Sequence, residues 1–260
     1  PEAVVLARPA VATESDWALR LDGARYVSFK DMSIRGYTTA VLLDRSPAGN
    51  AFENVTFTAA ASSPATRLVD IRGEHTDNAF RYSRFLGGGT GIRASSPNWS
   101  GSGLVVSGNT FTDQQNNALW IYRNREFNIS DNLFTATTDS LGYSALYLGN
   151  CDLGWEIRNN QIVSATGKGI WVHYCTNWEG GLNVLENNFV RVQGLDAGPG
   201  SALQVGTSAG LMIKYNTLVV GSGAGTGSST LLLPNDPGTP RGNFSVVNNI
   251  LANLGGGAAI

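Results

Sequence analysis

The sequence predicts an all-β fold, a solenoid of about nine turns with three short strands in each turn. Two short patterns alternate along its 260 residues. Each is too short for a helix and shows the alternation of a strand with one buried face. Because both patterns return at a nearly fixed spacing, we expect a repeat protein in which equivalent strands of neighbouring turns pair in parallel.

The first pattern is an apolar residue, a variable residue and a second apolar residue. Its nine copies are Leu19-Arg20-Leu21, Val41-Leu42-Leu43, Val69-Asp70-Ile71, Ile92-Arg93-Ala94, Leu119-Trp120-Ile121, Leu146-Tyr147-Leu148, Ile170-Trp171-Val172, Leu203-Gln204-Val205 and Leu231-Leu232-Leu233. In a strand of this kind the middle residue points outward while its neighbours point into the core. The middle residues should therefore line one outer surface, which we call the first-strand face.

The second pattern ends near an asparagine: an apolar residue, two variable residues, Asn, a variable residue and an apolar residue. The asparagines that fit it are Asn109, Asn132, Asn160, Asn187, Asn216 and Asn249. Buried asparagines at the same bend of successive turns can satisfy backbone groups that the bend leaves unpaired. In the earlier turns Met32, Val55 and Ser83 take this place, so the asparagine ladder is expected to begin at Asn109.

These two patterns make the chain resemble the right-handed parallel β-helix superfamily, the pectate-lyase-like fold, over essentially its whole length. The resemblance implies a right-handed single-stranded parallel β-helix. We expect one domain over residues 1–260, either a whole protein or a piece of a longer one. The final GGGAAI gives no sign of a capping helix, and solenoid ends need polar caps. Stacking on a neighbouring domain or subunit is therefore expected at the ends.

Charge and composition narrow the range of partners. A net charge of −2 gives no electrostatic footprint for nucleic acid, so no nucleic acid partner is expected. The chain has no apolar run long enough to predict a membrane span. No metal site and no cofactor are predicted, because Cys151 and Cys175 match neither a zinc spacing nor a CxxC motif.

The two cysteines lie at equivalent positions of adjacent turns, each three residues after an inward-pointing strand residue, Leu148 or Val172. Stacked turns place equivalent Cα atoms roughly 4.8 Å apart, inside the range of about 4.4 to 6.8 Å that a disulfide tolerates. We expect a disulfide in an oxidising compartment, with two stacked free thiols as the alternative.

Three aromatic residues follow one another on the first-strand face: Trp120, Tyr147 and Trp171. A flat aromatic strip suits the faces of sugar rings, and the superfamily that the chain resembles uses this face as its polysaccharide groove. With Arg93 and Gln204 in the same column, these are the predicted substrate-binding residues. The alternative is structural, because aromatic pairs on neighbouring strands also stabilise a sheet.

Catalysis at the same face is the second possibility, with Asp70, Arg93, Tyr122, Tyr147 and His173 as candidates. A lyase acting on uronates needs a cation beside the sugar carboxylate and a base for the adjacent proton. The simpler interpretation of Asp70 is an ion pair with Arg93 or Arg72, which would contribute under about 1 kcal/mol if exposed. For His173 the simpler interpretation is a surface hydrogen bond.

A glycosidase would need two carboxylates about 5 to 9.5 Å apart. The carboxylates considered for that role are Asp70, Glu74, Asp152 and Glu179. No two of them fall on adjacent first strands.

The favoured prediction is therefore a secreted or cell-surface β-helix that binds extracellular polysaccharide along its first-strand face. A polysaccharide lyase or glycosidase acting at that face is one alternative. A structural or adhesin repeat module without catalytic activity is the other.

Overall fold

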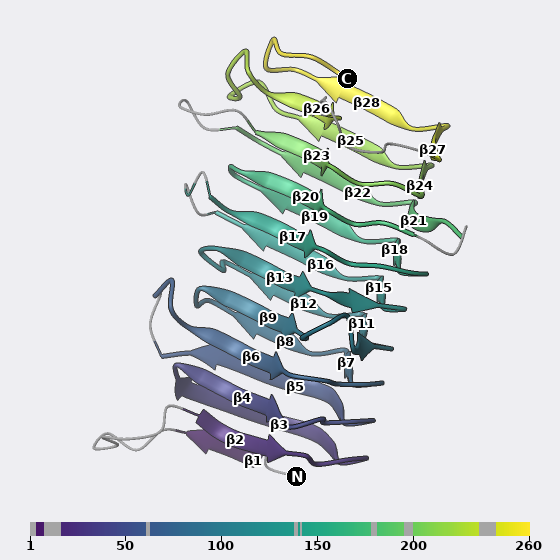
Figure 1. Ribbon diagram of the computed structural model, residues 1–260. Helices are drawn as coiled ribbons and strands as arrows, with labels where there is room; N and C mark the ends of the chain where they lie inside the picture. The colour runs from purple at the N-terminus through teal and green to yellow at the C-terminus, as the bar shows by residue number, and fades with distance from the viewer. Residues whose placement is uncertain are drawn as a thin grey trace.

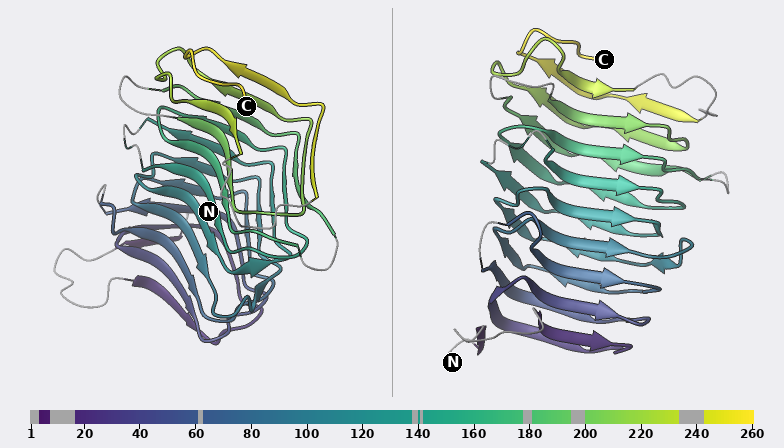
Figure 2. Two further views of the ribbon diagram at one scale, coloured as in Figure 1. Left: turned by 45° about the horizontal axis from the view of Figure 1, so that its top comes forward. Right: turned by 60° about the vertical axis from the view of Figure 1, so that its left-hand side comes forward.

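The computed structural model describes residues 4–7, 17–60, 63–137, 140, 142–177, 181–194, 200–233 and 243–260. This part of the chain winds into a stack of turns built from parallel strands (Figure 1). Seen from two further directions, the turns follow one another along a single axis (Figure 2). The described residues contain no helix, and therefore none that could cross a membrane. The predicted parallel β-helix is confirmed.

The first strands form a nine-stranded parallel sheet within the described residues. Its members are β2 (Trp17–Asp22), β4 (Thr39–Asp44), β6 (Arg67–Arg72), β9 (Thr90–Ser95), β13 (Asn117–Tyr122), β17 (Ser144–Gly149), β20 (Lys168–His173), β23 (Ser201–Gly206) and β26 (Ser229–Leu232). The register pairs Tyr147 with Trp120 on one side and with Trp171 on the other. The first pattern in the sequence therefore aligned these turns correctly.

Second and third strands share a larger sheet and are separated at a bend. The second strands are β7 (Ala79–Arg81), β11 (Val105–Ser107), β15 (Asn128–Ser130), β18 (Glu156–Arg158), β21 (Asn183–Glu186), β24 (Leu211–Lys214) and β27 (Phe244–Val247). The third strands are β1 (Val4–Ala7), β8 (Arg84–Leu86), β12 (Thr110–Thr112), β16 (Leu133–Ala136), β19 (Gln161–Ser164), β22 (Phe189–Val192), β25 (Thr217–Val220) and β28 (Ile250–Asn253).

In two early turns the second and third strands are one continuous strand. These are β3 (Ser28–Tyr37) and β5 (Ala51–Ala59), which carry Met32 and Val55 where later turns have Ser or Asn. A further short pair, β10 (Gly101–Ser102) and β14 (Asn124–Arg125), lies where the chain leaves the first-strand sheet.

The core is a set of columns along the axis of the stack. One of them consists of stacked phenylalanine rings, with centroids 4.7, 4.4 and 4.9 Å apart from turn to turn in the series Phe57, Phe85, Phe111 and Phe134. All four side chains are fully buried. Because each turn packs on the next, burial on the inward side of every strand holds the outward side in a fixed position.

The asparagine ladder begins at Asn109, as predicted. Each side-chain amide donates to the side-chain oxygen of the next turn at 2.9 to 3.0 Å, along the series Asn109, Asn132, Asn160, Asn188, Asn216 and Asn249. The same oxygens accept the backbone N–H of the preceding member, for example 3.0 Å from Asn160 to Asn188. One turn earlier, Ser83 joins the ladder by donating its backbone N–H to Asn109 at 2.8 Å.

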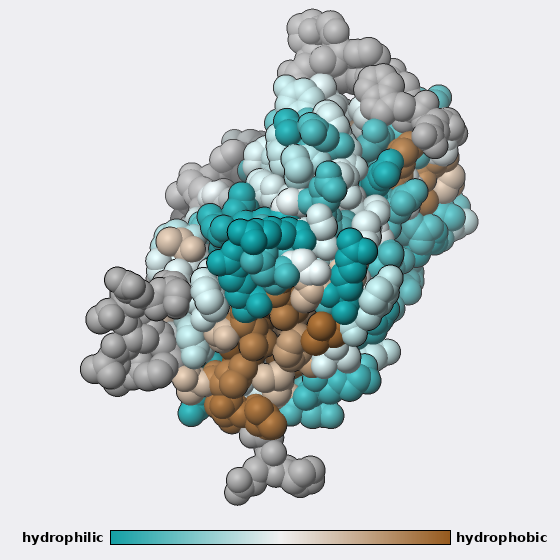
Figure 3. All heavy atoms as spheres, turned by 60° about the horizontal axis from the view of Figure 1, so that its bottom comes forward, coloured by the Kyte–Doolittle hydropathy of each residue, from teal (hydrophilic) through white to brown (hydrophobic). Residues whose placement is uncertain are grey.

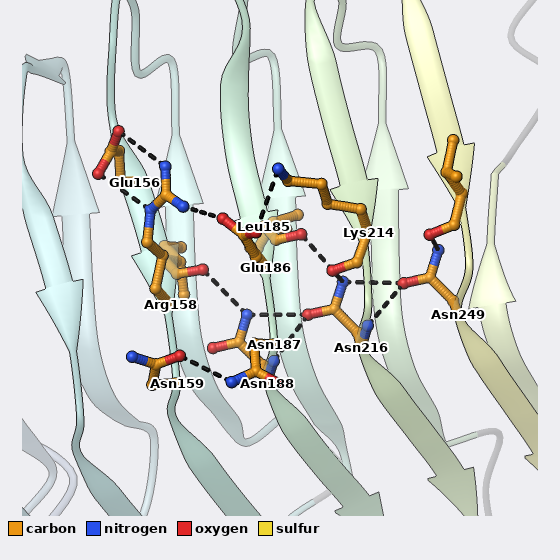
Figure 4. A network of polar contacts seen from close by, with 12 residues as sticks. Glu156, Arg158, Asn159, Leu185, Glu186, Asn187, Asn188, Lys214, Asn216 and Asn249 are labelled. Atoms are coloured by element: carbon orange, nitrogen blue, oxygen red, sulfur yellow. Dashed lines mark hydrogen bonds and ion pairs between the residues drawn. The ribbon is translucent and has the colours of Figure 1, made fainter.

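The assignment of Asn187 to this ladder was wrong by one residue. Leu185 faces the core, not Val184, so the buried bend position belongs to Asn188. Asn187 is exposed and donates to Asn159 at 2.9 Å (Figure 4). The sequence misleads here because two consecutive asparagines and flanking apolar residues fit the pattern in either register.

The predicted disulfide is absent from the structure, in which Cys151 and Cys175 are buried free thiols. Their equivalence was correct, but both side chains point toward the preceding turn. The Cys175 sulfur accepts the backbone N–H of Cys151 at 3.3 Å, and the Cys151 sulfur lies 3.5 Å from the carbonyl oxygen of Ile121. Each thiol therefore contacts the backbone of the preceding turn.

Apolar residues are exposed at both ends of the described stack. Figure 3 looks toward the N-terminal end and shows an apolar patch, where Val4 and Val5 are 60% and 47% exposed. At the other end Ile250 and Leu254 are each 64% exposed. Stacking of a partner on these ends stays a prediction.

Candidate functional site

The aromatic strip, defined as Trp120, Tyr147 and Trp171, lies on the outward side of β13, β17 and β20. The rings of Trp120 and Tyr147 are stacked with centroids 5.8 Å apart, and Tyr147 meets Trp171 edge to face at 5.0 Å. All three side chains are half-buried. The strip therefore has a hydrophobic surface that is in contact with solvent and supported from beneath by the sheet.

Glycine makes room for the ring of Tyr147. A Cβ atom on Gly149 would lie 2.7 Å from the Tyr147 hydroxyl and 2.9 Å from the ring of Tyr122. Any side chain at this position would therefore displace both tyrosines. The ring of Tyr122 in turn stacks on Trp120 at 5.3 Å, so the strip is widened beside β13.

The hydroxyl of Tyr147 is protonated at neutral pH. Burial raises its pKa, and the neighbouring Cys175 and Tyr122 add to the effect. Such a phenol can donate a hydrogen bond or a proton to a ligand, but it is a poor base at neutral pH. His173 lies at the other end of the strip, with its ring 5.6 Å from Trp171 and 4.2 Å from Tyr174.

An arginine cluster, defined as Arg67, Arg72 and Arg93 around Asp70, borders the strip. Asp70 accepts from Arg72 at 2.8 and 2.6 Å, and its carboxylate lies 3.4 Å from Arg67 and 3.6 Å from Arg93. The expected ion pair is present with both Arg72 and Arg93, and its carboxylate is buried, because the Asp70 side chain is 0% exposed. The three guanidinium groups cover the carboxylate, which leaves Asp70 inaccessible to a ligand.

Arg93 joins this cluster to the strip. Its guanidinium lies 4.9 Å from the centre of the Trp120 ring, in cation–π contact. Burial lowers the pKa of Arg93, an effect opposed by Asp70 and reinforced by Arg67 and Arg72. A pocket of about 200 Å³ opens between Arg67, Arg93 and Trp120, with Thr90, Asn116, Asn117 and Pro64 completing its wall.

Trp99 is a site residue that the repeat patterns did not reveal. It lies in the segment after β9, is 42% exposed, and donates its indole N–H to the carbonyl oxygen of Asn150 at 2.6 Å. Arg123 lies between Trp99 and Tyr122, with its guanidinium 5.3 and 5.2 Å from the two ring centres. Trp99 therefore reaches across a whole turn and borders the strip where the first strands end.

Two further polar residues extend the strip. Gln204 pairs with Trp171 in the sheet and continues the outward column, half-buried. Lys168, at the start of β20, places its ammonium group 4.4 Å from the centre of the Trp171 ring. Burial lowers the pKa of Lys168.

The structure brings together no convincing pair of glycosidase carboxylates among the described residues. Asp70 is covered by arginines, and Glu74 and Asp152 lie beyond the ends of β6 and β17. Glu179 lies outside the described residues. In the same part of the chain, no group of three or more His, Cys, Asp or Glu side chains is placed to hold a metal ion.

Comparison with known families gives a match to the right-handed beta helix region, over residues 17–189 and 71–236. The chain belongs to the right-handed β-helix family. Among solved structures it is similar to the A-module of a mannuronan C-5 epimerase from Azotobacter vinelandii, with 12% sequence identity and a TM-score of 0.55. That alignment covers 91% of this chain and 62% of the epimerase module. At this identity the similarity supports the fold alone. Comparison with curated proteins gives no match.

Proposed function

We propose that this β-helix binds polysaccharide along its first-strand face, with the aromatic strip as the platform. The observation that carries the proposal is the strip itself: three aromatic side chains on adjacent hydrogen-bonded strands, supported by a sheet and half open to solvent. Sugar rings have apolar C–H faces that pack on aromatic rings, and a row of such rings suits a linear chain of sugars.

The comparisons add support of a general kind. The epimerase module that shares this fold is named for action on mannuronan, a polysaccharide. A parallel β-helix offers a long straight face, which suits a linear polymer better than a compact ligand. We further propose that the protein works in the extracellular space or on a cell surface, where such polymers occur, and that residues 1–260 act as one binding module.

A glycan array tests this function directly, followed by titration of any glycan that binds. Trp120→Ala and Trp171→Ala should each weaken binding by roughly tenfold or more, because each removes one stacking surface. Tyr215→Ala is the matched control, since Tyr215 is exposed beyond the end of β24 and away from the strip. If both tryptophan variants bind as tightly as the parent protein, the polysaccharide groove lies elsewhere.

The same variants separate binding from a structural role. If the strip only stabilises the sheet, Trp120→Ala and Trp171→Ala should both lower the urea midpoint. In that case the parent protein should also bind no glycan on the array. That result would favour a structural or adhesin module.

An enzyme acting at this face is the second candidate. It is favoured by the convergence of Arg93, Tyr122, Tyr147 and His173 around one strip, which offers a cation and proton-transfer groups to a bound sugar. Product analysis decides between binding and turnover. Unsaturated ends would indicate a lyase, and new reducing ends alone would indicate a glycosidase. If every glycan that binds is recovered unchanged, both activities are excluded.

A further inference from the structure

We propose that the pocket between Arg67 and Arg93 binds an anionic group of the glycan, a carboxylate or a sulfate, at one end of the aromatic strip. The inference rests on the proposed polysaccharide-binding function and adds the chemical class of the ligand. It would make the protein selective for acidic glycans over neutral ones.

The charge balance of the arginine cluster is the first argument. In the described part of the chain, Arg67, Arg72 and Arg93 share one carboxylate, that of Asp70. The cluster therefore carries a net charge of about +2, in a chain whose net charge is −2. An isolated excess of positive charge on an outward sheet face attracts an anion.

The geometry of the cluster is the second argument. Arg72 makes the shortest hydrogen bonds to Asp70, at 2.8 and 2.6 Å, and Arg67 donates to the same carboxylate oxygen at 3.4 Å. Arg67 and Arg93 lie farther away, at 3.4 and 3.6 Å, and their side chains remain 38% and 30% exposed. A guanidinium has five N–H donors, so Arg67 and Arg93 keep donors available to a ligand beside their contacts to Asp70.

The pocket places these donors beside the aromatic strip. Both Arg67 and Arg93 line it, and so does Trp120, the first ring of the strip. Its volume of about 200 Å³ exceeds the space of a few water molecules, at about 30 Å³ each, so a carboxylate or sulfate fits. Planar guanidinium groups bind such anions through paired hydrogen bonds.

Other cations along the strip strengthen the argument. Lys168 lies over Trp171, and Arg123 lies between Trp99 and Tyr122. Neither has an ion-pair partner among the described residues. By contrast, Arg158 and Lys214 on the second strands are paired with Glu156 and Glu186 (Figure 4). Lys168 and Arg123 therefore add positive charge beside the aromatic strip.

The test compares glycans that differ only in charge. The probes are linear hexamers of galacturonate, mannuronate and glucuronate, each as the free acid and as the neutral methyl ester. A sulfated galactan and its desulfated form distinguish sulfate from carboxylate as the source of the anion. We expect at least one anionic probe to bind roughly tenfold or more tightly than its neutral partner, with an affinity that falls as salt is raised.

Variants then locate the effect. Arg67→Gln and Arg93→Gln should each remove most of the preference for the anionic probe, while the neutral partner binds as before or loses only a few-fold. Arg84→Gln is the matched control, since it removes the same charge from β8, outside the first-strand sheet. A urea midpoint close to that of the parent protein, measured for each variant, separates lost recognition from lost folding.

The outcomes distinguish this inference from the function on which it rests. If acid and ester bind equally and Trp120→Ala weakens both, the strip binds sugar and the anion pocket is wrong. A preference that survives both arginine substitutions would also overturn the pocket. If no probe binds in either form and the glycan array is negative, the polysaccharide function fails as well.

Discussion

At the scale of single residues, the bends of the solenoid depend on buried polar side chains that are matched to the backbone. Asn160 is the clearest case, because its amide donates to the carbonyl oxygens of Ile129 and Arg158 and to the side chain of Asn188, each within 3.0 Å. Its own side-chain oxygen accepts from Asn132. Removing this side chain leaves buried polar groups on two neighbouring turns without partners.

We therefore expect Asn160→Ala to lower the free energy of unfolding by about 1 to 3 kcal/mol, the cost of unsatisfied buried hydrogen-bonding groups. Urea denaturation measures the change. Asn187→Gly is the control, because Asn187 is exposed and its left-handed φ of 54° suits glycine, so stability should change by under about 0.5 kcal/mol. Equal effects of the two substitutions would contradict the assignment of the ladder.

His75 is a buried residue of a different kind. Its side chain is 1% exposed, and neither ring nitrogen has a hydrogen-bond partner among the described residues. Burial lowers the pKa of His75 from 6.5 to about 4. The unfolded chain thus binds a proton between these two pH values that the folded chain does not, so stability falls as the pH falls through that window.

Lowering the pH from 7 to 5 should therefore cost about 2 kcal/mol through His75 alone, which urea denaturation at the two pH values would detect. His75→Phe should reduce the pH dependence by that amount, because the group no longer titrates. His173→Phe, which removes the other histidine, is the comparison variant. A pH dependence that is the same in all three proteins would show that His75 is not buried as a neutral group.

At the scale of the elements, a column of bend residues where the first strands end shows that thiols can replace amides. Asn124, Cys151, Cys175 and Ser208 occupy successive turns where the first strands end, and the backbone N–H of Cys175 donates to Ser208 at 3.1 Å. The Cys175 sulfur accepts from Cys151, and it lies 3.6 Å from the carbonyl oxygen of Leu148. The column needs a small hydrogen-bonding side chain, and cysteine, serine and asparagine all satisfy that need.

Cys175→Ser should therefore be tolerated, with a loss of under about 1 kcal/mol, because serine keeps a donor and an acceptor in place. Cys175→Val, of similar size, should cost about 1 to 3 kcal/mol, since the backbone N–H of Cys151 then loses its partner. Intact mass after alkylation in denaturant without reductant gives a separate check. Two added alkyl groups would agree with free thiols, whereas no added group would establish a disulfide.

At the scale of the whole molecule, each turn is stabilised mainly by the turns on either side of it. Phe111 lies between Phe85 and Phe134, with centroids 4.4 and 4.9 Å away, and is fully buried. Phe29 lies in an early turn, is half-buried, and stacks on Phe52 at 5.0 Å. Phenylalanine is therefore found both in an interior turn and in an early turn of the same stack of turns.

Phe111→Ala should cost about 3 to 5 kcal/mol, because a large cavity opens between two packed turns. Phe29→Ala should cost less, since its side chain is partly exposed and, among the described residues, its ring stacks only on Phe52. Chemical denaturation of both variants makes the comparison. A larger loss from Phe29→Ala would show that the N-terminal turns are packed against something further.

The sequence by itself determined the solenoid, the first-strand register and the outward positions of Trp120, Tyr147 and Trp171. It could do so because side-chain alternation is a local property. When the same local pattern is repeated, equivalent residues of successive turns lie directly above one another. The ladder from Asn109 onward followed for the same reason. The exception, Asn187 for Asn188, arose where two adjacent registers satisfy the same local pattern.

Only the tertiary structure decided what lies across from each position. It buried Asp70 under three arginines, directed both thiols to the preceding turn, and brought Trp99 into contact with Arg123 and Asn150. These contacts join residues of different turns, and several involve the connecting segments. The lengths of those segments vary, and the repeat pattern does not specify their paths. A periodic pattern specifies which way a side chain points, whereas burial and charge balance depend on neighbours brought close by folding.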